Sequence, residues 1–436
     1  MKPKIIAILL CLTGMTVFAE GPDMSYYMQE FSNLRATFLE RLEILETVRD
    51  ANYTEIGEFY HDALKVLIHR IPDINTSWDR GNVEASARIL VQGLAAEIYT
   101  EAAPEIWQIV QFADTVRIEN DGILMQEALI ALGQVGDLTY VRHITLRLDN
   151  YNAEVISDLE TRSRVQRGVV GCINALEALG DPAGYRHVFL VTVGWYDMAI
   201  RNIARSALPN ILEDPADIII EIIQAPSIAP SVKLEALQEM LASQAPDSSK
   251  ARVAAAALDT GWTYITSDIN NQRILREMRA LAIDTIRDLG VYTPDSDPAP
   301  VAVVATGDDD EEENETRIEI NSVYVNLRRS YMNNFVNVSP DFDEIRRTIL
   351  ALSALGTDEA VDMLLVFLRE LHIRRRLGPW DTTRERQVFN WIVTGLGETE
   401  TQSPDARNLL NSIQRSGDYT GAEQTWARNA LARLSQ

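Results

Sequence analysis

Cysteine and histidine are scarce in this sequence. Its 436 residues include two cysteines, Cys11 and Cys172, and five histidines. Removal of the N-terminal leader described below leaves Cys172 alone, so no internal disulfide can form and stability must come from an apolar core. The histidines show no His-x-x-x-His spacing and no Cys-x-x-Cys pair occurs, so no metal site is predicted.

Cys172 lies on an apolar stripe with Val169, Leu176 and Leu179. A nucleophilic cysteine needs an exposed position beside a histidine or at a helix start. The sequence places no such feature beside Cys172, so we expect it to be a small buried residue of the core.

The recurrent catalytic motifs are also missing from the sequence. It contains no Gly-x-Ser-x-Gly elbow, no phosphate-binding loop and no dinucleotide fingerprint. Carboxylates are plentiful, but no pair is marked by its context as an acid and base couple. We therefore predict no catalytic residue and no cofactor, and expect that the protein is not an enzyme.

Basic residues are few relative to acidic ones. The chain has 40 Lys and Arg against 64 Asp and Glu, which gives a formal net charge of −24. A surface this acidic repels phosphate backbones and anionic lipids, so nucleic acid and direct membrane binding are disfavoured and a basic protein partner is favoured. Hydrophobic residues make up 46% and charged residues 24%, as in soluble globular or repeat proteins.

Long hydrophobic runs are confined to the N-terminus. Lys2 and Lys4 precede an apolar run at 5–18, and Val17-Phe18-Ala19 offers small residues for cleavage. The run is shorter than the roughly 20 apolar residues of a membrane span. Residues 1–19 therefore predict a signal peptide and export to the periplasm or cell envelope of a bacterium. A lipoprotein modified at Cys11 and an uncleaved anchor are the alternatives.

A short repeated motif is present along the chain. The hexapeptide Ala-Leu-x-Ala-Leu-Gly occurs at 128–133, 175–180 and 351–356, and 392–397 has the looser form IVTGLG. The recurring Ala and Leu predict one stripe of an amphipathic helix. We expect the glycines Gly133, Gly180 and Gly356 to end their helices in the left-handed conformation.

The junctions between helices carry a second signal. Asp181 and Pro182 follow Gly180 and are suited to the cap and first turn of the next helix. Asp197 and Arg201 stand at the entry of another helix. Helices that end in Gly-Asp-Pro and begin with Asp-x-x-x-Arg resemble HEAT repeats, including the bacterial HEAT-like subset first noted in phycobilisome lyases.

The resemblance covers most of 83–290 and 340–434. It implies an all-α fold, an α/α superhelix in which antiparallel helix pairs stack as a solenoid. It also implies a concave surface that holds another protein.

The pattern predicts five segments. After the signal peptide at 1–19, residues 20–82 form an N-terminal helical cap. It has one helix at 24–50, whose apolar stripe includes Phe31, Leu34 and Phe38, and a second helix at 55–70. A repeat array follows at 83–290, and further repeats occupy 319–436. The Pro-rich and acidic stretch 291–318 is a linker between two arrays or an insertion in one continuous superhelix, because its run of carboxylates cannot pack.

Two basic dipeptides are candidate binding residues. Arg142-His143 and Arg186-His187 lie 44 residues apart, at the same offset from Asp137 and Asp181. If they stack on successive repeats, they form either a polar helix edge or a ridge that contacts an acidic partner.

Several aromatic residues near predicted turns are candidate interface anchors. They are Trp195, Tyr196, Trp262, Tyr264 and Trp380.

Three functions fit these observations. The first is an exported, non-enzymatic scaffold that binds a protein on its helical surface. The second is an enzyme or enzyme accessory subunit of the HEAT-like lyase type, which a deep pocket with converging polar groups would favour. The third is a structural component of a cell-envelope assembly.

Overall fold

The protein is described from a computed structural model. The structure describes residues 24–114, 121–154, 156, 158–289, 323–336, 340–377, 382–399 and 403–434. The predicted signal peptide at 1–19 and the stretch 291–318 lie outside these ranges. The chain divides into two compact units, 1–179 and 180–436, and each is taken by itself.

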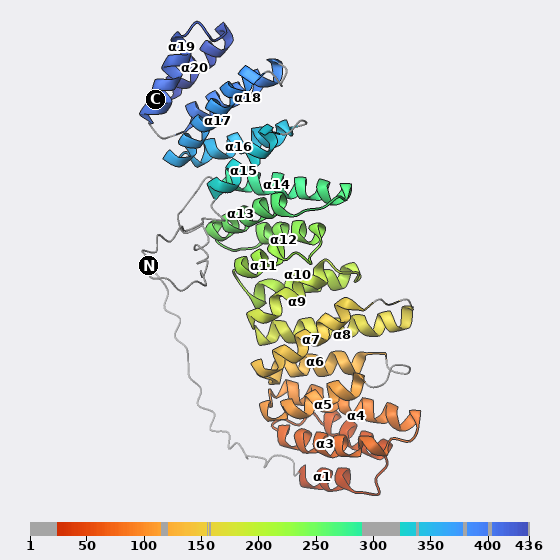
Figure 1. The fold of residues 1–436 in the computed structure, drawn as a ribbon. Helices are drawn as coiled ribbons and strands as arrows, with labels where there is room; N and C mark the ends of the chain where they lie inside the picture. Colours follow the sequence, from red (N-terminus) through yellow and green to blue (C-terminus); the bar gives the residue numbers. More distant parts are fainter. Residues whose placement is uncertain are drawn as a thin grey trace, which may run out of the picture. The chain divides into compact units, whose positions relative to one another are not determined.

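Unit 1 is a stack of helix pairs (Figure 1). Odd-numbered helices pack on odd ones, as α1 on α3 and α3 on α5, and even-numbered helices pack on even ones, as α2 on α4, α4 on α6 and α6 on α8. Each odd helix also packs on the even helix that follows it. The helices are α1 Met24–Ser32, α2 Phe38–Asp50, α3 Gly57–Arg70, α4 Ser77–Ala96, α5 Ala103–Asp114, α6 Ile123–Val135, α7 Val141–Ala153 and α8 Leu159–Leu179, with 3₁₀ turns η1 Ile71–Asp73, η2 Thr100–Ala102 and η3 Leu138–Tyr140.

Unit 2 repeats this two-layer arrangement. Leucine, isoleucine and alanine side chains between its layers are buried, which gives each pair an apolar interior that it could not form alone. The helices are η4 Pro182–Gly184 (a 3₁₀ turn), α9 Tyr185–Thr192, α10 Met198–Ile211, α11 Ala216–Gln224, α12 Pro230–Ala242, α13 Asp247–Thr263, α14 Ile269–Leu289, α15 Val323–Val336, α16 Phe342–Leu355, α17 Asp358–Leu377, α18 Thr382–Glu398, α19 Pro404–Arg415 and α20 Gly421–Arg433.

In each unit the described residues form helices and turns without a strand. The predicted all-α class of stacked antiparallel helix pairs is therefore confirmed.

The helices on either side of 291–318 pack directly on one another. Within unit 2, α13 contacts α15 and α14 contacts α16, so the odd and even layers both continue past this stretch. The boundary between the two compact units falls between Leu179 and Gly180, and the predicted array 83–290 contributes helices to both units.

Glycine ends two of the predicted helices as expected. Gly180 follows α8 and Gly356 follows α16, each with a φ of +62°, which is the left-handed conformation. Next to Gly180, the side chain of Asp181 accepts a hydrogen bond from the backbone N–H of Ala183, and Pro182 occupies the first position of η4. The predicted Gly-Asp-Pro junction is confirmed.

The prediction for Gly133 is wrong. This residue is not a helix end, because α6 continues to Val135. A Cβ atom on Gly133 would lie 2.5 Å from the Cα atom of Ala175 on α8, so the glycine allows two helices to approach closely. Gly397 does the same on α18, where a Cβ would lie 2.6 Å from the Cα atom of Ala430 on α20.

The single helix predicted at 24–50 is also wrong. The chain breaks between Ser32 and Phe38 into α1 and α2, and Leu34, expected on the buried stripe, is 78% exposed. Thr37 and Glu40 form a capping box in which each side chain accepts a hydrogen bond from the other residue's backbone N–H. This reciprocal cap starts a new helix where the apolar spacing alone suggests continuation.

Buried cations cap the preceding helix in three pairs. Arg41 on α2 donates to the carbonyl oxygens of Phe31, Asn33 and Ala36, which follow or end α1. The Nζ atom of Lys233 on α12 donates to the carbonyls of Ile223 and Ala225 at the end of α11, and Arg279 on α14 donates to Gly261 near the end of α13. Phe31, Ile223 and Gly261 lie in the last turn of their helices, so each cation satisfies a carbonyl that has no partner within its own helix.

Candidate protein-binding surface

The dipeptide Arg142-His143 lies at the start of a helix in unit 1. Asp137 is the N-cap of η3, where its carboxylate accepts a hydrogen bond from the N–H of Thr139 at 2.8 Å. The turn leads directly into α7, so Arg142 and His143 are its second and third residues, and both are exposed. The Asp137 cap therefore fixes where α7 begins and so the positions of Arg142 and His143 on it.

Three rings gather at this point. The centroid of the Trp107 ring on α5 lies 5.2 Å from that of His143 and 6.3 Å from that of Tyr140 on η3. The ring centroids of Tyr140 and His143 lie 6.5 Å apart. Trp107 and Tyr140 are half-buried, so their rings are held by the fold and still meet solvent.

A hollow of about 540 Å³ lies beside the rings, lined by Trp107, His143, Leu146 and Arg147 among others. Leu146 is 61% exposed although it is apolar. Arg147 forms an ion pair with Asp114 at 3.0 Å and lies 5.9 Å from the Trp107 ring centroid. We call the residues Trp107, Tyr140, His143, Leu146 and Arg147 the Trp107 surface.

Acidic groups influence this surface. Hydrogen bonds from the hydroxyl and N–H of Thr139 lower the pKa of Asp137, which keeps its carboxylate ionised at neutral pH. Burial raises the pKa of Tyr140, and the negative charges of Asp137 and Glu105 raise it further. Both carboxylates therefore act at the ring cluster.

Tyr151 also lines the hollow. Burial raises the pKa of the Tyr151 hydroxyl to about 12, so this group stays neutral. Tyr151 packs against Gly168 on α8, where a Cβ atom would lie 2.7 Å from the hydroxyl oxygen.

The second dipeptide, Arg186-His187, occupies the same offset in unit 2. It begins α9 after the Asp181 cap, and both side chains are half-buried. Because the two dipeptides belong to different units, the ridge predicted from their spacing stays a prediction.

The aromatic pair after α9 agrees with the prediction only in part. The rings of Trp195 and Tyr196 lie 4.4 Å apart, and Trp195 is half-buried. Tyr196 is only 2% exposed, so the prediction that it is an exposed anchor is wrong. It packs under the turn, where a Cβ atom on Gly194 would lie 3.0 Å from its ring. Trp380 lies outside the described residues.

Sequence reasoning missed Trp107, Tyr140, Leu146 and Arg147. Trp107 comes from the preceding helix pair, and its spacing on α5 does not indicate which ring it will meet. Tyr140 carried the better signal, because it is an aromatic residue in a capped turn three residues after Asp137.

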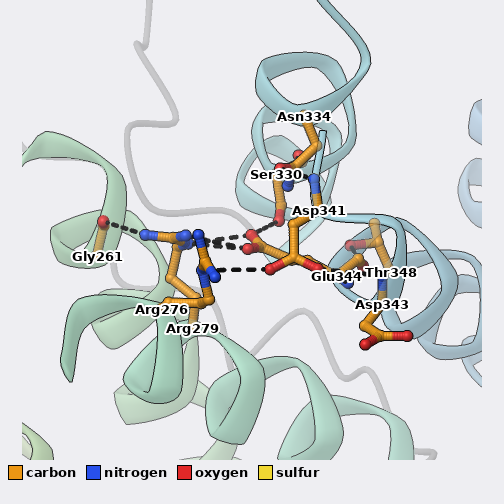
Figure 2. A network of polar contacts seen from close by, with 9 residues as sticks. All are labelled: Gly261, Arg276, Arg279, Ser330, Asn334, Asp341, Asp343, Glu344 and Thr348. Atoms are coloured by element: carbon orange, nitrogen blue, oxygen red, sulfur yellow. Dashed lines mark hydrogen bonds and ion pairs between the residues drawn. The ribbon is translucent and has the colours of Figure 1, made fainter. Parts of the chain in front are cut away.

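A buried polar network in unit 2 was also missed (Figure 2). Arg279 on α14 donates to both carboxylate oxygens of Glu344 on α16, at 3.0 and 3.2 Å from Nε. The hydroxyl of Ser330 on α15 donates to the same carboxylate at 2.5 Å. Arg279 also lies 4.0 Å from the ring centroid of Trp262. No sequence signal connects these residues, since 65 positions and the stretch 291–318 separate Arg279 from Glu344.

This network joins helices and offers no accessible reactive group. Ser330 and Glu344 are almost completely buried, and the two oxygens of Glu344 are engaged by Arg279 and Ser330. At its rim Arg276 pairs with Asp341 at 3.3 Å, beside a hollow of about 610 Å³ (Figure 2). The arginines that line this hollow are matched by carboxylates, so its charges balance.

Cys172 is fully buried, and burial raises the pKa of its thiol to about 12. The prediction of a core residue is confirmed. In the described ranges, no three His, Cys, Asp or Glu side chains gather closely enough to hold a metal ion. No helix of the described part is both long and apolar enough to cross a membrane.

Comparison with known proteins finds two solved structures of low similarity. No family model and no curated protein matches the chain. A chain in the solved SYS-1/POP-1 complex is 12% identical with a TM-score of 0.31, over 93% of this chain and 72% of that chain. A structure concerning the interaction between cadherin and beta-catenin is 12% identical with a TM-score of 0.28, over 94% of both chains. Scores this low support no inference about function, and the fold class rests on the helix packing described above.

Proposed function

We propose that this chain is a non-enzymatic scaffold of HEAT-like helix pairs that binds another protein through the Trp107 surface. The observation that carries the proposal is the cluster of three rings beside exposed Leu146 and a hollow. Tryptophan, tyrosine and arginine are the residues that most often dominate binding energy at protein interfaces. The helix α5 packs on α3 and α6, and α7 packs on α8. These contacts hold the side chains of the Trp107 surface in place, so little ordering is needed on binding.

The partner we expect is a protein with a basic surface. The net charge of −24 attracts such a partner and repels nucleic acid. Electrostatic attraction of this kind acts mainly on the rate of association and weakens with salt.

Site-specific photo-crosslinking tests the proposal. A benzoylphenylalanine at Leu146 should crosslink to one protein in the native envelope fraction, whereas the same probe at Leu34 should not. Both positions are exposed leucines of unit 1, so they differ mainly in whether the Trp107 surface is adjacent. The crosslinked protein is then purified, and its binding to the wild type is compared with binding to Trp107→Ala and to Trp78→Ala, a change of an exposed tryptophan on α4. Equal crosslinking from both positions, or equal loss of binding in both variants, would contradict the proposal.

The proposal also places the chain outside the cytoplasm of a bacterium. Its support is the leader at 1–19, with Lys2 and Lys4 before an apolar run. The N-terminal sequence of the protein purified from envelope fractions tests this. Removal of the leader at Ala19 agrees with export as a soluble protein, a lipidated Cys11 indicates a lipoprotein, and an intact Met1 contradicts cleavage.

A further inference from the structure

The ring cluster has the dimensions of a cation-binding site. Its three centroids lie 5.2, 6.3 and 6.5 Å apart. With this spacing one cation can lie within about 6 Å of all three centroids, the range in which ring faces attract a positive charge. Trp107 contributes the ring that binds cations best among aromatic side chains.

Two carboxylates act at the cluster, and the nearby guanidinium of Arg147 is paired with Asp114. The charges that raise the pKa of Tyr140 are those of Asp137 and Glu105, so two carboxylates act at the cluster. Asp137 stays ionised, because Thr139 hydrogen bonds lower its pKa. The Oε2 atom of Glu105 on α5 lies 3.1 Å from Nε2 of His61, and this contact holds the Glu105 carboxylate in place.

The chain already uses aromatic rings in this way. The Arg147 guanidinium lies 5.9 Å from the Trp107 ring centroid, and that of Arg279 lies 4.0 Å from the ring of Trp262. Arg147 is held by Asp114 and its side chain is 13% exposed, so it approaches Trp107 from within the fold. The exposed side of the cluster, next to His143 and Leu146, is where a partner can approach.

A second copy of the motif in unit 2 provides an internal comparison. Residues 136–143 read GDLTYVRH and residues 180–187 read GDPAGYRH. The aspartate, arginine and histidine occupy equal positions, but Gly184 replaces Tyr140, and the neighbouring Tyr185 is 2% exposed. The half-buried ring of Tyr140 therefore distinguishes the first copy from the second.

We propose that the rings of Trp107, Tyr140 and His143 hold a lysine or arginine side chain of a basic partner, with Asp137 and Glu105 as the countercharges. This inference rests on the proposed function, because it names the chemistry that the same surface recognises. The competing possibility is that Arg142 and His143 contact an acidic partner, and the experiment separates the two.

Fluorescence anisotropy with the full-length protein measures the binding of labelled heptalysine and heptaglutamate at physiological salt. Heptalysine should bind the wild type, and Trp107→Leu and Tyr140→Leu should each weaken its binding by about tenfold, or about 1.4 kcal/mol. This is the size of the loss of one partly desolvated cation–π contact. These changes leave the net charge unaltered, so non-specific attraction to an acidic protein is the same in all of them. Tyr140→Phe keeps the ring and should retain binding.

The matched control is His187→Ala, in the copy of the motif that has Gly184 in place of Tyr140. It should leave heptalysine binding unchanged, whereas His143→Ala should weaken it. Circular dichroism and thermal unfolding confirm that each variant is folded. Equal heptalysine binding by the wild type and both leucine variants would overturn the inference, as would preferential binding of heptaglutamate.

Failure of this inference and failure of the proposed function give different results. If the probe at Leu146 crosslinks to a protein but heptalysine binds the leucine variants as tightly as the wild type, the scaffold proposal stands and the cation inference falls. If the leucine variants bind heptalysine more weakly but the probe at Leu146 crosslinks to no protein, the rings bind cations and the scaffold proposal falls.

Discussion

Gly180 and Gly133 each end a copy of the same hexapeptide, and a side chain is disfavoured at each for a different reason. A Cβ atom on Gly180 would meet nothing within 4 Å, but its φ of +62° is strained for other residues. Gly133 has helical geometry, but a Cβ atom there would lie 2.5 Å from the Ala175 Cα atom. Backbone conformation limits the first glycine, and helix packing limits the second.

We expect Gly180→Val to lower the free energy of unfolding by about 1–2 kcal/mol, because valine resists a positive φ. Gly133→Ala should lower it by about 1–3 kcal/mol, because α6 and α8 must move apart. Gly417→Ala is the control, with open space around the added methyl group and no positive φ. Urea denaturation measures all three, and an unchanged midpoint for Gly180→Val would refute the assigned helix end.

Lys233 makes stability depend on pH. Burial lowers its pKa to about 8, while its ordinary value is 10.5. Below pH 8 the amine is charged in both the folded and the unfolded chain, so the cost of burying the charge is present in full. Above pH 8 the folded chain releases the proton first, so the unfolded chain binds more protons and stability rises with pH.

The wild type should therefore gain about 2 kcal/mol relative to Lys233→Met between pH 7 and pH 9.5, at roughly 1.4 kcal/mol for each pKa unit. At pH 7 the variant loses the bonds from Nζ to the carbonyls of Ile223 and Ala225 but also loses the buried charge. Urea denaturation of both proteins at the two pH values gives the difference. A difference that is constant with pH would show that Lys233 does not titrate in this window.

Among the secondary-structure elements, those bounded by strong caps were the most predictable. The sequence predicted the end of α8 and the start of η4 because Gly180, Asp181 and Pro182 each supply a separate local reason. The break before α2 was predictable as well, since Thr37 and Glu40 have the capping-box spacing, but the apolar stripe through Leu34 outweighed it. The close contact at Gly133 was not predictable, because it depends on Ala175, a residue of the next even-numbered helix.

The join of α14, α15 and α16 depends on the Arg279 and Glu344 pair. Arg279→Met leaves a buried carboxylate without its cation and should lower the free energy of unfolding by about 3–5 kcal/mol. The double variant Arg279→Met/Glu344→Met should lose less than Arg279→Met alone, because it removes both charges.

Arg276→Met is the matched control for this join. Arg276 pairs with Asp341 at 3.3 Å but is largely exposed, so its removal should change the free energy of unfolding by about 0–1 kcal/mol. Urea denaturation compares the wild type with these three variants. A double variant less stable than Arg279→Met would show that the pair does not act as a unit.

For the whole chain, the sequence predicted the fold class far better than the surface. The repeated apolar hexapeptides and the Gly-Asp-Pro junction at 180–182 are local signals, so their interpretation does not depend on how one helix packs on another. The Trp107 surface combines residues from α5, η3 and α7, so it depends on how one pair packs on the next. The sequence therefore predicted His143 as a binding residue, whereas the positions of Trp107 and Tyr140 beside it are seen only in the structure.

Packing across 291–318 leads to a prediction for unit 2. In addition to the Arg279 and Glu344 pair, Arg329 pairs with Asp259 and Arg347 pairs with Asp284. Both helix layers also continue past this stretch, as α13 contacts α15 and α14 contacts α16. Non-covalent contacts therefore connect the helices before and after it, in addition to the peptide chain itself.

A protease site inserted between Thr306 and Gly307 should allow the chain to be cut without separation of the pieces. The two fragments should elute together in size-exclusion chromatography and keep the helical circular dichroism of the uncut protein. In the Arg279→Met background the same cut should separate the fragments at a lower urea concentration, because the buried pair is part of what holds them. Fragments that separate without denaturant would show instead that two independent arrays meet here, because a continuous stack buries apolar surface on both sides of the cut.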